Sequence, residues 1–346
     1  MDRLYAALPG AVAVVDVNSD AEVDVDGNST ASVVRTTAPH PEASIQCVTA
    51  SSADPDLVCC GTADHGLFRS TDAGETWRPV EGIAQDRVTS VTAAVADESS
   101  GPGRDGDHVA WWAGTEPSRV FYANDGARWT EREGLTDLPS SSSWAFPPRP
   151  HTHHVRWIEA DPYDTDRLYV AVEAGALVTT HDGGETWEDR VEGSRRDTHS
   201  MTTHPDAPGR VYCAAGDGYA ETTDGGETWD LVQEGLDHRY CWSVVVDPSD
   251  PDHRLVSAAR GAMTAHRAGS ADSYVYRKRG GEPWERVDGL PTGGGVTRYV
   301  LAVGDEGFYA LSNAGLFRSA EGEEWEPLPL DVGDDATAAG LAVVAR

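Results

Sequence analysis

The chain has 346 residues, of which 58 are acidic and 27 are lysine or arginine, giving a formal net charge of −31. This charge argues against a nucleic acid as partner, because two polyanions repel each other. No apolar run reaches the ~18 residues that a membrane-spanning helix needs, so we expect no membrane segment.

The N-terminal residues predict β-strands that belong to a repeated unit. Residues 1–25 carry several acidic side chains and no cleavage pattern, so we expect no signal peptide. Residues 2–15 match residues 166–179 nearly in register, which predicts the second and third strands of one repeat. Residues 22–25 would then form its outer strand. The inner strand is expected at residues 339–344, where it would leave no free sheet edge.

One short signature recurs along the chain and marks the repeats. It reads STDAGETW at residues 70–77, THDGGETW at 180–187 and TTDGGETW at 222–229. Degenerate copies end at Trp129, Trp284 and Trp325. Successive tryptophans of these copies are 41 to 58 residues apart, which is the spacing of a repeat architecture.

Each repeat has the strand content of one propeller blade. In the repeat that contains Trp187, β-rich runs bounded by turn residues lie at 155–159, 167–172 and 176–180. Trp187 would open a fourth strand. In the turn before it, the Asp182 carboxylate and the Thr180 hydroxyl can accept backbone N–H groups that a tight loop would otherwise leave unpaired.

The signature resembles the Asp-box, or BNR repeat, of sialidases, sortilin-type receptors, some endoglucanases and photosystem II assembly factors. The resemblance implies an all-β, seven-bladed β-propeller with four-stranded blades, in the broad class that includes WD40 and YVTN-like repeats. We expect one domain over residues 1–346, with one blade split between residues 1–35 and 335–346. The alternative is six blades and a loose N-terminal hairpin.

In the resembled family the box is a structural turn on the face away from the ligand. The resemblance therefore implies that Asp72, Asp182 and Asp224 stabilise turns. The alternative is that these carboxylates are catalytic or bind a metal. However, one active site does not need three equivalent acids on three blades.

Lysine is almost absent from the chain, since Lys278 is the only one. An acid-rich, lysine-poor composition resembles that of haloarchaeal proteins, which work at molar salt, where the Debye length is about 3 Å. At low salt the mutual repulsion of the acidic groups should destabilise the fold. The alternative is that the acidic surface serves a basic partner.

Cysteine usage points to a reducing compartment. The five cysteines, an odd number, include no C-x-x-C pair: Cys47, Cys59, Cys60, Cys213 and Cys241. They lie in strand-like runs, so we expect small, reduced, buried side chains. Together with the expected lack of a signal peptide, this favours a cytoplasmic location.

Arginine and histidine concentrate where the loops of one face of the ring should meet. The blade-to-blade loops and the loops between second and third strands open on that face, opposite the boxes. We expect these residues to bind a ligand at the central mouth: Arg87, His153, His154, Arg156, Glu173, Arg196, His199, Asp217, His238, Arg239, Tyr240 and Arg298. Clustered arginines suit a carboxylate, a phosphate or a sugar acid. The alternative is that these charged groups pair with one another across the channel, which would then hold water and no ligand.

The longest loop, residues 134–154, should project from the same face. It could cover the mouth, or dock a partner through exposed aromatic groups such as Trp144. His151 and His153 would share one side of an extended segment, and with His199 they could bind a transition metal. Because no recognised ligand spacing is present, we expect no metal and no other cofactor.

Three classes of function fit these observations. The first is a binding or assembly propeller, similar to the photosystem II assembly factors, for a small anionic or carbohydrate-like ligand or a protein partner. The second is a sialidase-like glycoside hydrolase using Glu116, Glu173 and Tyr240, although the Arg-Ile-Pro signature of sialidase propellers is absent. The third is a structural interaction hub that uses the rim. We expect a monomer in each case.

Overall fold

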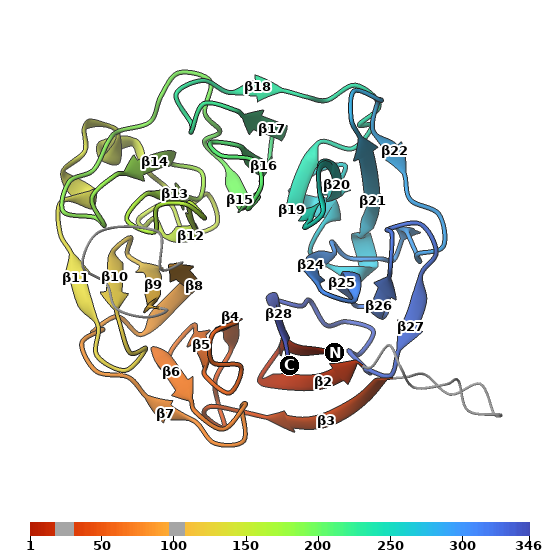
Figure 1. The fold of residues 1–346 in the computed structure, drawn as a ribbon, viewed down its shortest axis with the longest axis horizontal. Coiled ribbons are helices and arrows are strands. Elements are labelled where there is room, and N and C mark those ends of the chain that lie inside the picture. Colours follow the sequence, from red (N-terminus) through yellow and green to blue (C-terminus); the bar gives the residue numbers. More distant parts are fainter. Residues whose placement is uncertain (18–30, 97–107) are drawn as a thin grey trace.

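The computed structural model describes residues 1–17, 31–96 and 108–346, and its strands form seven sheets arranged in a ring (Figure 1). One strand of each sheet faces the centre, and the others follow outward. This is the arrangement of a seven-bladed β-propeller. The all-β fold class predicted from the repeats is therefore confirmed.

The strands of each blade are given from the centre outward. Blade 1 comprises β28 (Gly340–Ala345), β1 (Asp2–Leu8), β2 (Ala11–Val17) and β3 (Ala31–Thr37). Blade 2 comprises β4 (Ile45–Ala50), β5 (Val58–Thr62), β6 (Leu67–Ser70) and β7 (Arg78–Pro79). Blade 3 comprises β8 (Arg87–Ala96), β9 (His108–Glu116), β10 (Val120–Ala123) and β11 (Thr130–Arg132). Blade 4 comprises β12 (Val155–Ala160), β13 (Leu168–Val172) and β14 (Ala176–Thr180).

The remaining blades follow the same order. Blade 5 comprises β15 (Thr198–Thr203), β16 (Val211–Ala215), β17 (Gly218–Thr222) and β18 (Asp230–Leu231). Blade 6 comprises β19 (Tyr240–Asp247), β20 (Asp250–Ala259), β21 (Asp272–Arg279) and β22 (Glu285–Arg286), with β23 (Gly293–Gly294) also paired to β21. Blade 7 comprises β24 (Val300–Gly304), β25 (Gly307–Ser312), β26 (Gly315–Ser319) and β27 (Glu326–Leu328). Short 3-10 helices lie in two loops: η1 (Leu135–Asp137), η2 (Pro139–Ser143), η3 (Ala262–Thr264) and η4 (Ala268–Ser270).

Hydrophobic side chains fill the spaces between neighbouring blades. Successive residues of a strand point to opposite faces of the sheet, and both faces of a blade lie against a neighbour. The second strands of blades 4 and 5 are apolar throughout: β13 reads LYVAV and β16 reads VYCAA, with every residue buried. Buried tyrosines of these strands also link blades, since the hydroxyls of Tyr169 and Tyr212 donate to the carbonyls of Gly225 and Pro251 in the next blade.

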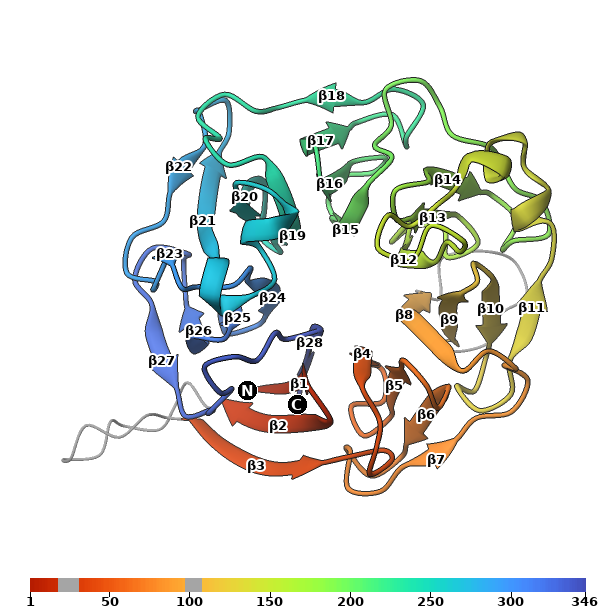
Figure 2. The ribbon, with the colours of Figure 1, turned by 180° about the vertical axis from the view of Figure 1, so that it is seen from behind.

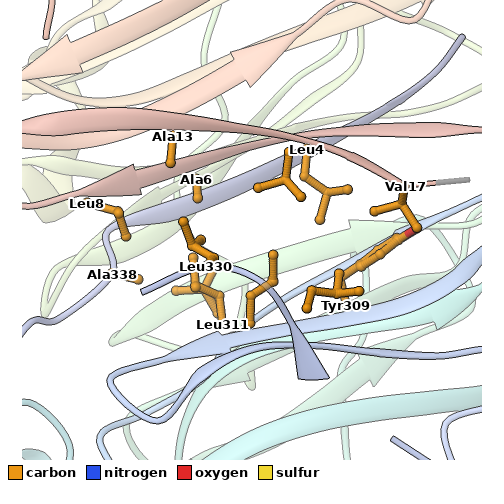
Figure 3. Packing of buried hydrophobic residues seen from close by; sticks show 13 residues of the cluster. Leu4, Ala6, Leu8, Ala13, Val17, Tyr309, Leu311, Leu330 and Ala338 are labelled. Carbon is orange, nitrogen blue, oxygen red and sulfur yellow. The ribbon is translucent and has the colours of Figure 1, made fainter. Parts of the chain in front are cut away.

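The two chain ends close the ring by sharing blade 1. β28 pairs antiparallel with β1 along most of its length. Blade 1 then packs against blade 7 through a buried cluster that includes Leu4 and Leu311 (Figure 3). In the same interface the Tyr309 hydroxyl donates to the Asp2 carboxylate at 2.9 Å. Closure by a C-terminal inner strand is confirmed, and the six-bladed alternative is wrong.

Two outer strands differ from the expectation. The segment 22–25 lies outside the described residues, and the outer strand of blade 1 is β3, which extends past residue 35. In blade 4 the expected fourth strand is reduced to a single bridge between Thr179 and Glu188. Beyond this bridge, Asp189 accepts the backbone N–H of Ser140 from the loop that holds η2, so the chain leaves the sheet edge.

The strand order assigns the loops to two faces, which Figures 1 and 2 view from opposite sides. Because neighbouring strands of a blade are antiparallel, successive connections alternate between the faces. The box turns connect third to fourth strands, as between β6 and β7. The blade-to-blade connections and the loops between second and third strands therefore lie on the opposite face.

Two expectations from composition concern membrane-spanning helices and the cysteines. None of the helical segments in the described part of the chain has the length and apolar character needed to span a bilayer. All five cysteines are free and buried, and burial raises the pKa of the Cys47 thiol to about 12. They are packing residues, as their positions in apolar strands predicted.

Candidate functional site

The three complete box turns satisfy their own polar groups. In the turn after β17, the Asp224 carboxylate accepts the Thr228 backbone N–H at 2.9 Å and the Thr228 hydroxyl at 2.6 Å. The Thr222 hydroxyl donates to Asp224 at 2.7 Å and accepts the N–H of Gly226, which has a φ of +94°. The turns at Asp72 and Asp182 contain the same bonds.

These bonds account for the acidity of the box carboxylates. Hydrogen bonds from the side chain and backbone of the threonine four residues later lower the pKa of Asp72, Asp182 and Asp224 to about 2. A hydrogen-bonded carboxylate prefers its charged form. The three aspartates thus make their hydrogen bonds within their own turns. These turns lie on the face opposite the blade-to-blade loops.

A cavity of about 570 Å³ opens on the blade-to-blade face, and we call it the mouth. Its walls come from the starts of inner strands and from adjoining loops. The charged and aromatic residues that line it are Arg87, Phe146, Arg149, His154, Arg156, Glu173, Asp197, Tyr240, Trp242, His266 and Arg298. A second cavity of about 240 Å³ continues along the inner strands and shares Arg156 and Trp242 with the mouth.

Arg298 is the lining arginine without a carboxylate partner among the described residues. Arg87 and Arg149 lie 3.5 Å and 2.5 Å from Glu116, and Arg156 lies 3.7 Å from Glu173. Arg298 is 6% exposed, and its Nη1 donates to the Ala338 carbonyl at 3.0 Å.

The surroundings of Arg298 disfavour its charge. Burial and the neighbouring Arg156 lower the pKa of Arg298, but an arginine cannot release its proton at neutral pH. Cation–π contacts with the ring of Trp242 partly stabilise both positive charges, since the guanidinium groups of Arg298 and Arg156 lie 3.7 Å and 4.6 Å from its centroid.

His266 connects Arg298 to Tyr240, and the hydrogen-bond pattern fixes its proton. Arg298 Nε lies 3.0 Å from His266 Nδ1, and because a guanidinium can only donate, Nδ1 must be unprotonated. Burial and the Arg298 charge lower the pKa of His266 to about 3, so the ring is neutral and carries its proton on Nε2. That N–H donates to the Tyr240 oxygen at 3.1 Å. The Tyr240 O–H is then left to donate into the mouth.

Glu173 forms the anionic side of the mouth, at the loop between β13 and β14. Its Oε2 accepts from His154 Nε2 at 2.9 Å, and its Oε1 lies 4.0 Å from His199 Nε2. Burial alone would raise the pKa of Glu173, but the His154 hydrogen bond and the charges around it lower the pKa to about 2. Asp197 Oδ2 lies 3.8 Å from the same His199 Nε2, and burial raises the pKa of Asp197.

The long loop 134–154 lines the mouth with a different part than expected. Trp144 is 5% exposed and packs in the core between blades 3 and 4, so the expectation of an exposed Trp144 was wrong. Its indole N–H donates to Ser140 within the loop. Phe146 and Arg149 reach the mouth instead, where two nitrogens of Arg149 donate to both oxygens of Glu116.

The structure brings together some of the residues expected in the mouth and not others. Arg87, His154, Arg156, Glu173, Tyr240 and Arg298 line the cavity, and His199 lies directly behind Glu173. The others lie off the lining: His153 packs against Trp144, Arg196 donates to the Gly175 carbonyl, Asp217 pairs with Arg195, His238 stacks on Tyr274, and Arg239 is exposed. Of the three histidines considered for a metal, His151 is exposed, and only His199 lies beside carboxylates.

Four residues of the mouth were missed by sequence reasoning: Arg149, Asp197, Trp242 and His266. Trp242 follows Tyr240 by two positions on an inner strand, so strand periodicity could have found it. His266 lies in the long loop between β20 and β21, and no local pattern places it over the channel.

The comparisons support the fold. Neither protein-family models nor curated sequences match the chain. An ancestral GH74 enzyme has a similar structure, with a TM-score of 0.57 and 18% identity over 82% of this chain, which spans only 38% of that protein. YCF48 from Cyanidioschyzon merolae gives a TM-score of 0.57 and 15% identity over 84% of this chain and 87% of its own. YCF48 bound to a D1 peptide gives 0.52 and 16%, over 82% and 81%. At these identities the likeness shows that the chain shares a β-propeller fold with GH74 enzymes and YCF48.

Proposed function

We propose that the chain is a binding propeller whose mouth holds a carboxylate or a related oxyanion, carried by a small ligand or by a segment of a protein partner. The observation that carries this proposal is the Arg298 guanidinium, which is buried in the cavity wall without a carboxylate within 4 Å among the described residues. A buried charge without a counter-ion is unfavourable, and a bound anion would supply one.

Neighbouring groups fit the same ligand. The free O–H of Tyr240 and the Nη2 of Arg298 can both donate to one oxyanion, and charge-assisted hydrogen bonds of this kind are the strong ones. Trp242 is only 7% exposed and is covered by Arg298 and Arg156, so it holds these two groups in place for the ligand. A cavity of about 570 Å³ is large enough for a small organic anion or a short peptide segment.

A protein segment is a reasonable carrier of the anion. The similar propeller YCF48 is known in a structure bound to a D1 peptide. The present chain shares only the fold with it, so the proposal for a protein partner depends on the charges of the mouth and on this parallel in architecture.

The glycoside hydrolase alternative has weaker support. The resembled sialidases need a tyrosine paired with a glutamate, whereas the Tyr240 oxygen accepts from His266, and burial with the nearby Glu173 raises its pKa. Glu116 is held by Arg149 in a bidentate pair. The structural hub alternative is also weaker, because Trp144 is not available on the rim.

Calorimetric titration of the chain with glucuronate, N-acetylneuraminate and phosphate tests the proposal. Arg298→Gln should weaken binding by ~1.5–3 kcal/mol, the scale of a hydrogen bond to a charged group. Tyr240→Phe should weaken it by ~0.5–1.5 kcal/mol. Arg239→Gln is the matched control, since Arg239 is exposed beside Tyr240 and off the lining. Equal heats for the wild type and Arg298→Gln, both shown to be folded, would leave the mouth as a hydrated channel.

We also propose that the box turns are structural Asp-boxes and that the chain works as a monomer in a salt-rich cytoplasm. The self-contained hydrogen bonds of the turns support the first part. The charge of −31 with a single lysine supports the salt-rich setting. The response of stability to salt, described below, tests this setting.

A further inference from the structure

Three side chains of metal-ligand type converge in the wall of the mouth. They are Glu173 in the loop after β13, Asp197 just before β15, and His199 in β15. One ligand atom from each lies within 4.8 Å of the other two. His199 Nε2 is 3.8 Å from Asp197 Oδ2 and 4.0 Å from Glu173 Oε1.

The orientation of His199 is fixed by the backbone. Its Nδ1 lies 2.6 Å from the carbonyl oxygen of Cys241, and since a carbonyl only accepts, Nδ1 carries a proton. Nε2 is thereby left to face the two carboxylates. The side chain is fully buried, and Nε2 has no hydrogen-bond partner in the described protein. Several other buried nitrogens of the described residues also lack a hydrogen bond, but His199 Nε2 lies within 4.0 Å of oxygens from two different carboxylates. A buried polar atom without a partner is unfavourable.

A neutral His199 would point a lone pair at two carboxylates, which is unfavourable. A proton on Nε2 would help little, because 3.8 Å and 4.0 Å are too long for hydrogen bonds. An ion between the three atoms would satisfy all of them. With metal–ligand bonds of about 2.0–2.2 Å, two ligands of a tetrahedral ion lie about 3.3–3.6 Å apart. The 3.8 Å and 4.0 Å distances from His199 Nε2 are a few tenths of an ångström longer, and the two carboxylate oxygens lie within 4.8 Å of each other, so the three side chains need to close in slightly around an ion.

We propose that Glu173, Asp197 and His199 bind a divalent transition metal ion of the zinc type. One imidazole and two carboxylates are ligands that such ions accept, and the two carboxylates neutralise the charge of the ion. Arg156 approaches the opposite oxygen of Glu173, Oε2, and not the Oε1 that faces His199.

The surroundings of the three ligands resemble those of known metal sites. Each ligand is held by a second group: His199 by the Cys241 carbonyl, Glu173 by His154 at 2.9 Å, and Asp197 by the Ala174 backbone N–H at 3.1 Å. Such outer contacts orient metal ligands and strengthen binding. Three protein ligands leave a fourth position open, and Glu173 and Asp197 line the mouth. The site does not depend on Arg298 and therefore goes beyond the proposed function.

The test is zinc binding by the full chain after removal of metals with a chelator. Titration with ZnCl₂ against a competing chromophoric chelator should show one tight equivalent per chain. Asp197→Asn and His199→Gln should each weaken it by more than about tenfold, since even outer-shell changes cost 10- to 100-fold. Asp197 is partly exposed at 37%, so its variant should fold even if the His199 variant does not.

Two control variants test whether the zinc binds at these three residues. His181→Gln changes an exposed histidine that lies 3.4 Å from Glu188, and it should leave zinc affinity unchanged. Arg298→Gln should lose anion affinity and keep zinc, so the two proposals can fail separately. Cobalt(II) should give a visible absorption band that Asp197→Asn abolishes. The proposal is overturned if the wild type shows no tight equivalent, or if folded Asp197→Asn binds zinc as the wild type does.

Discussion

The box turns and the mouth use the same acidic residue types in opposite ways. At the box, Asp224 is exposed to solvent and receives all its hydrogen bonds from residues within four positions along the chain. In the mouth, Glu173 receives its partners from two segments far from it in sequence: His154 and Arg156 at the start of β12, and His199 in β15. The first carboxylate is satisfied by local sequence, and the second by the tertiary fold.

This difference indicates which of the two regions contains polar or charged groups without a partner. In each of the three complete box turns, the aspartate, the Ser or Thr two residues before it and the threonine four residues after it are joined by the same hydrogen bonds. In the mouth, Arg298 lacks a counter-ion among the described residues and His199 Nε2 lacks a hydrogen bond. A bound ligand or ion would therefore gain new interactions in the mouth and not at the box turns. Changes that affect one region and leave the other intact can therefore test this contrast.

The largest effect is expected from salt, because it acts on all 58 acidic side chains at once. Exposed charges are screened strongly at molar salt, whereas buried pairs in the mouth are screened little. Thermal unfolding followed by circular dichroism should show a midpoint that rises steeply from low salt to molar KCl. A flat response would mean that the acidic surface does not limit stability, and would favour a basic partner for it.

The next effect concerns a box tryptophan. Trp284 is 3% exposed and donates its indole N–H to the Val232 carbonyl at 2.7 Å. Trp284→Ala should lower the free energy of unfolding by ~3–5 kcal/mol, measured by denaturant titration. Binding of anions by the folded fraction should not change. Trp187→Ala should cost less, because Trp187 is only half-buried. Loss of binding at native stability would place a ligand site on the box face.

The fold could be predicted from sequence because its signals are local and repeated. A hydrogen-bonded turn such as 222–229 requires particular residues at fixed offsets, so it is visible in the sequence. The match of residues 2–15 to 166–179 predicted the terminal closure for the same reason. The outer strands were less predictable, because β7 and β18 contain only two residues each.

The mouth could be predicted only in outline. Inner-strand starts such as Arg156 and Tyr240 were found from the strand order. The direction of a loop side chain was not, so Arg239 was expected in the mouth although its neighbour Tyr240 is the one that lines it. His266 and Arg149 reach the mouth from long loops, whose conformation depends on contacts far apart in the sequence.

The third effect is a pH dependence of stability caused by Glu159, a carboxyl group in the channel. Glu159 lines the second cavity and accepts from Trp157 and Thr203, and burial raises its pKa to about 7. Below pH ~4.5 this group is protonated in both the folded and the unfolded state. As the pH rises from about 4.5 to 7, the unfolded chain ionises first, so stability is lost.

Glu159→Gln should remove that loss. Relative to the wild type, its free energy of unfolding should increase by ~1–3 kcal/mol between pH 4.5 and pH 8, less than the full shift implies because channel water screens the charge. Denaturant titrations at the two pH values measure it. Glu227→Gln, at an exposed box position, should show no such dependence. If both variants track the wild type, Glu159 is ionised in the folded protein.

The smallest effect is expected at a single box carboxylate. Asp224→Ala removes the acceptor for the Thr228 N–H and hydroxyl and for the Thr222 hydroxyl, and should cost ~1 kcal/mol, as for the loss of a helix cap. Because the pKa of Asp224 is lowered to about 2, its contribution is present above pH ~4 and disappears as the pH falls toward 2. The difference between wild type and variant should therefore vanish in acid, in the direction opposite to that at Glu159. Asp224→Asn keeps one acceptor oxygen and should lose less. An Asp224→Ala chain of native stability that no longer binds anions would reverse the roles of the two faces.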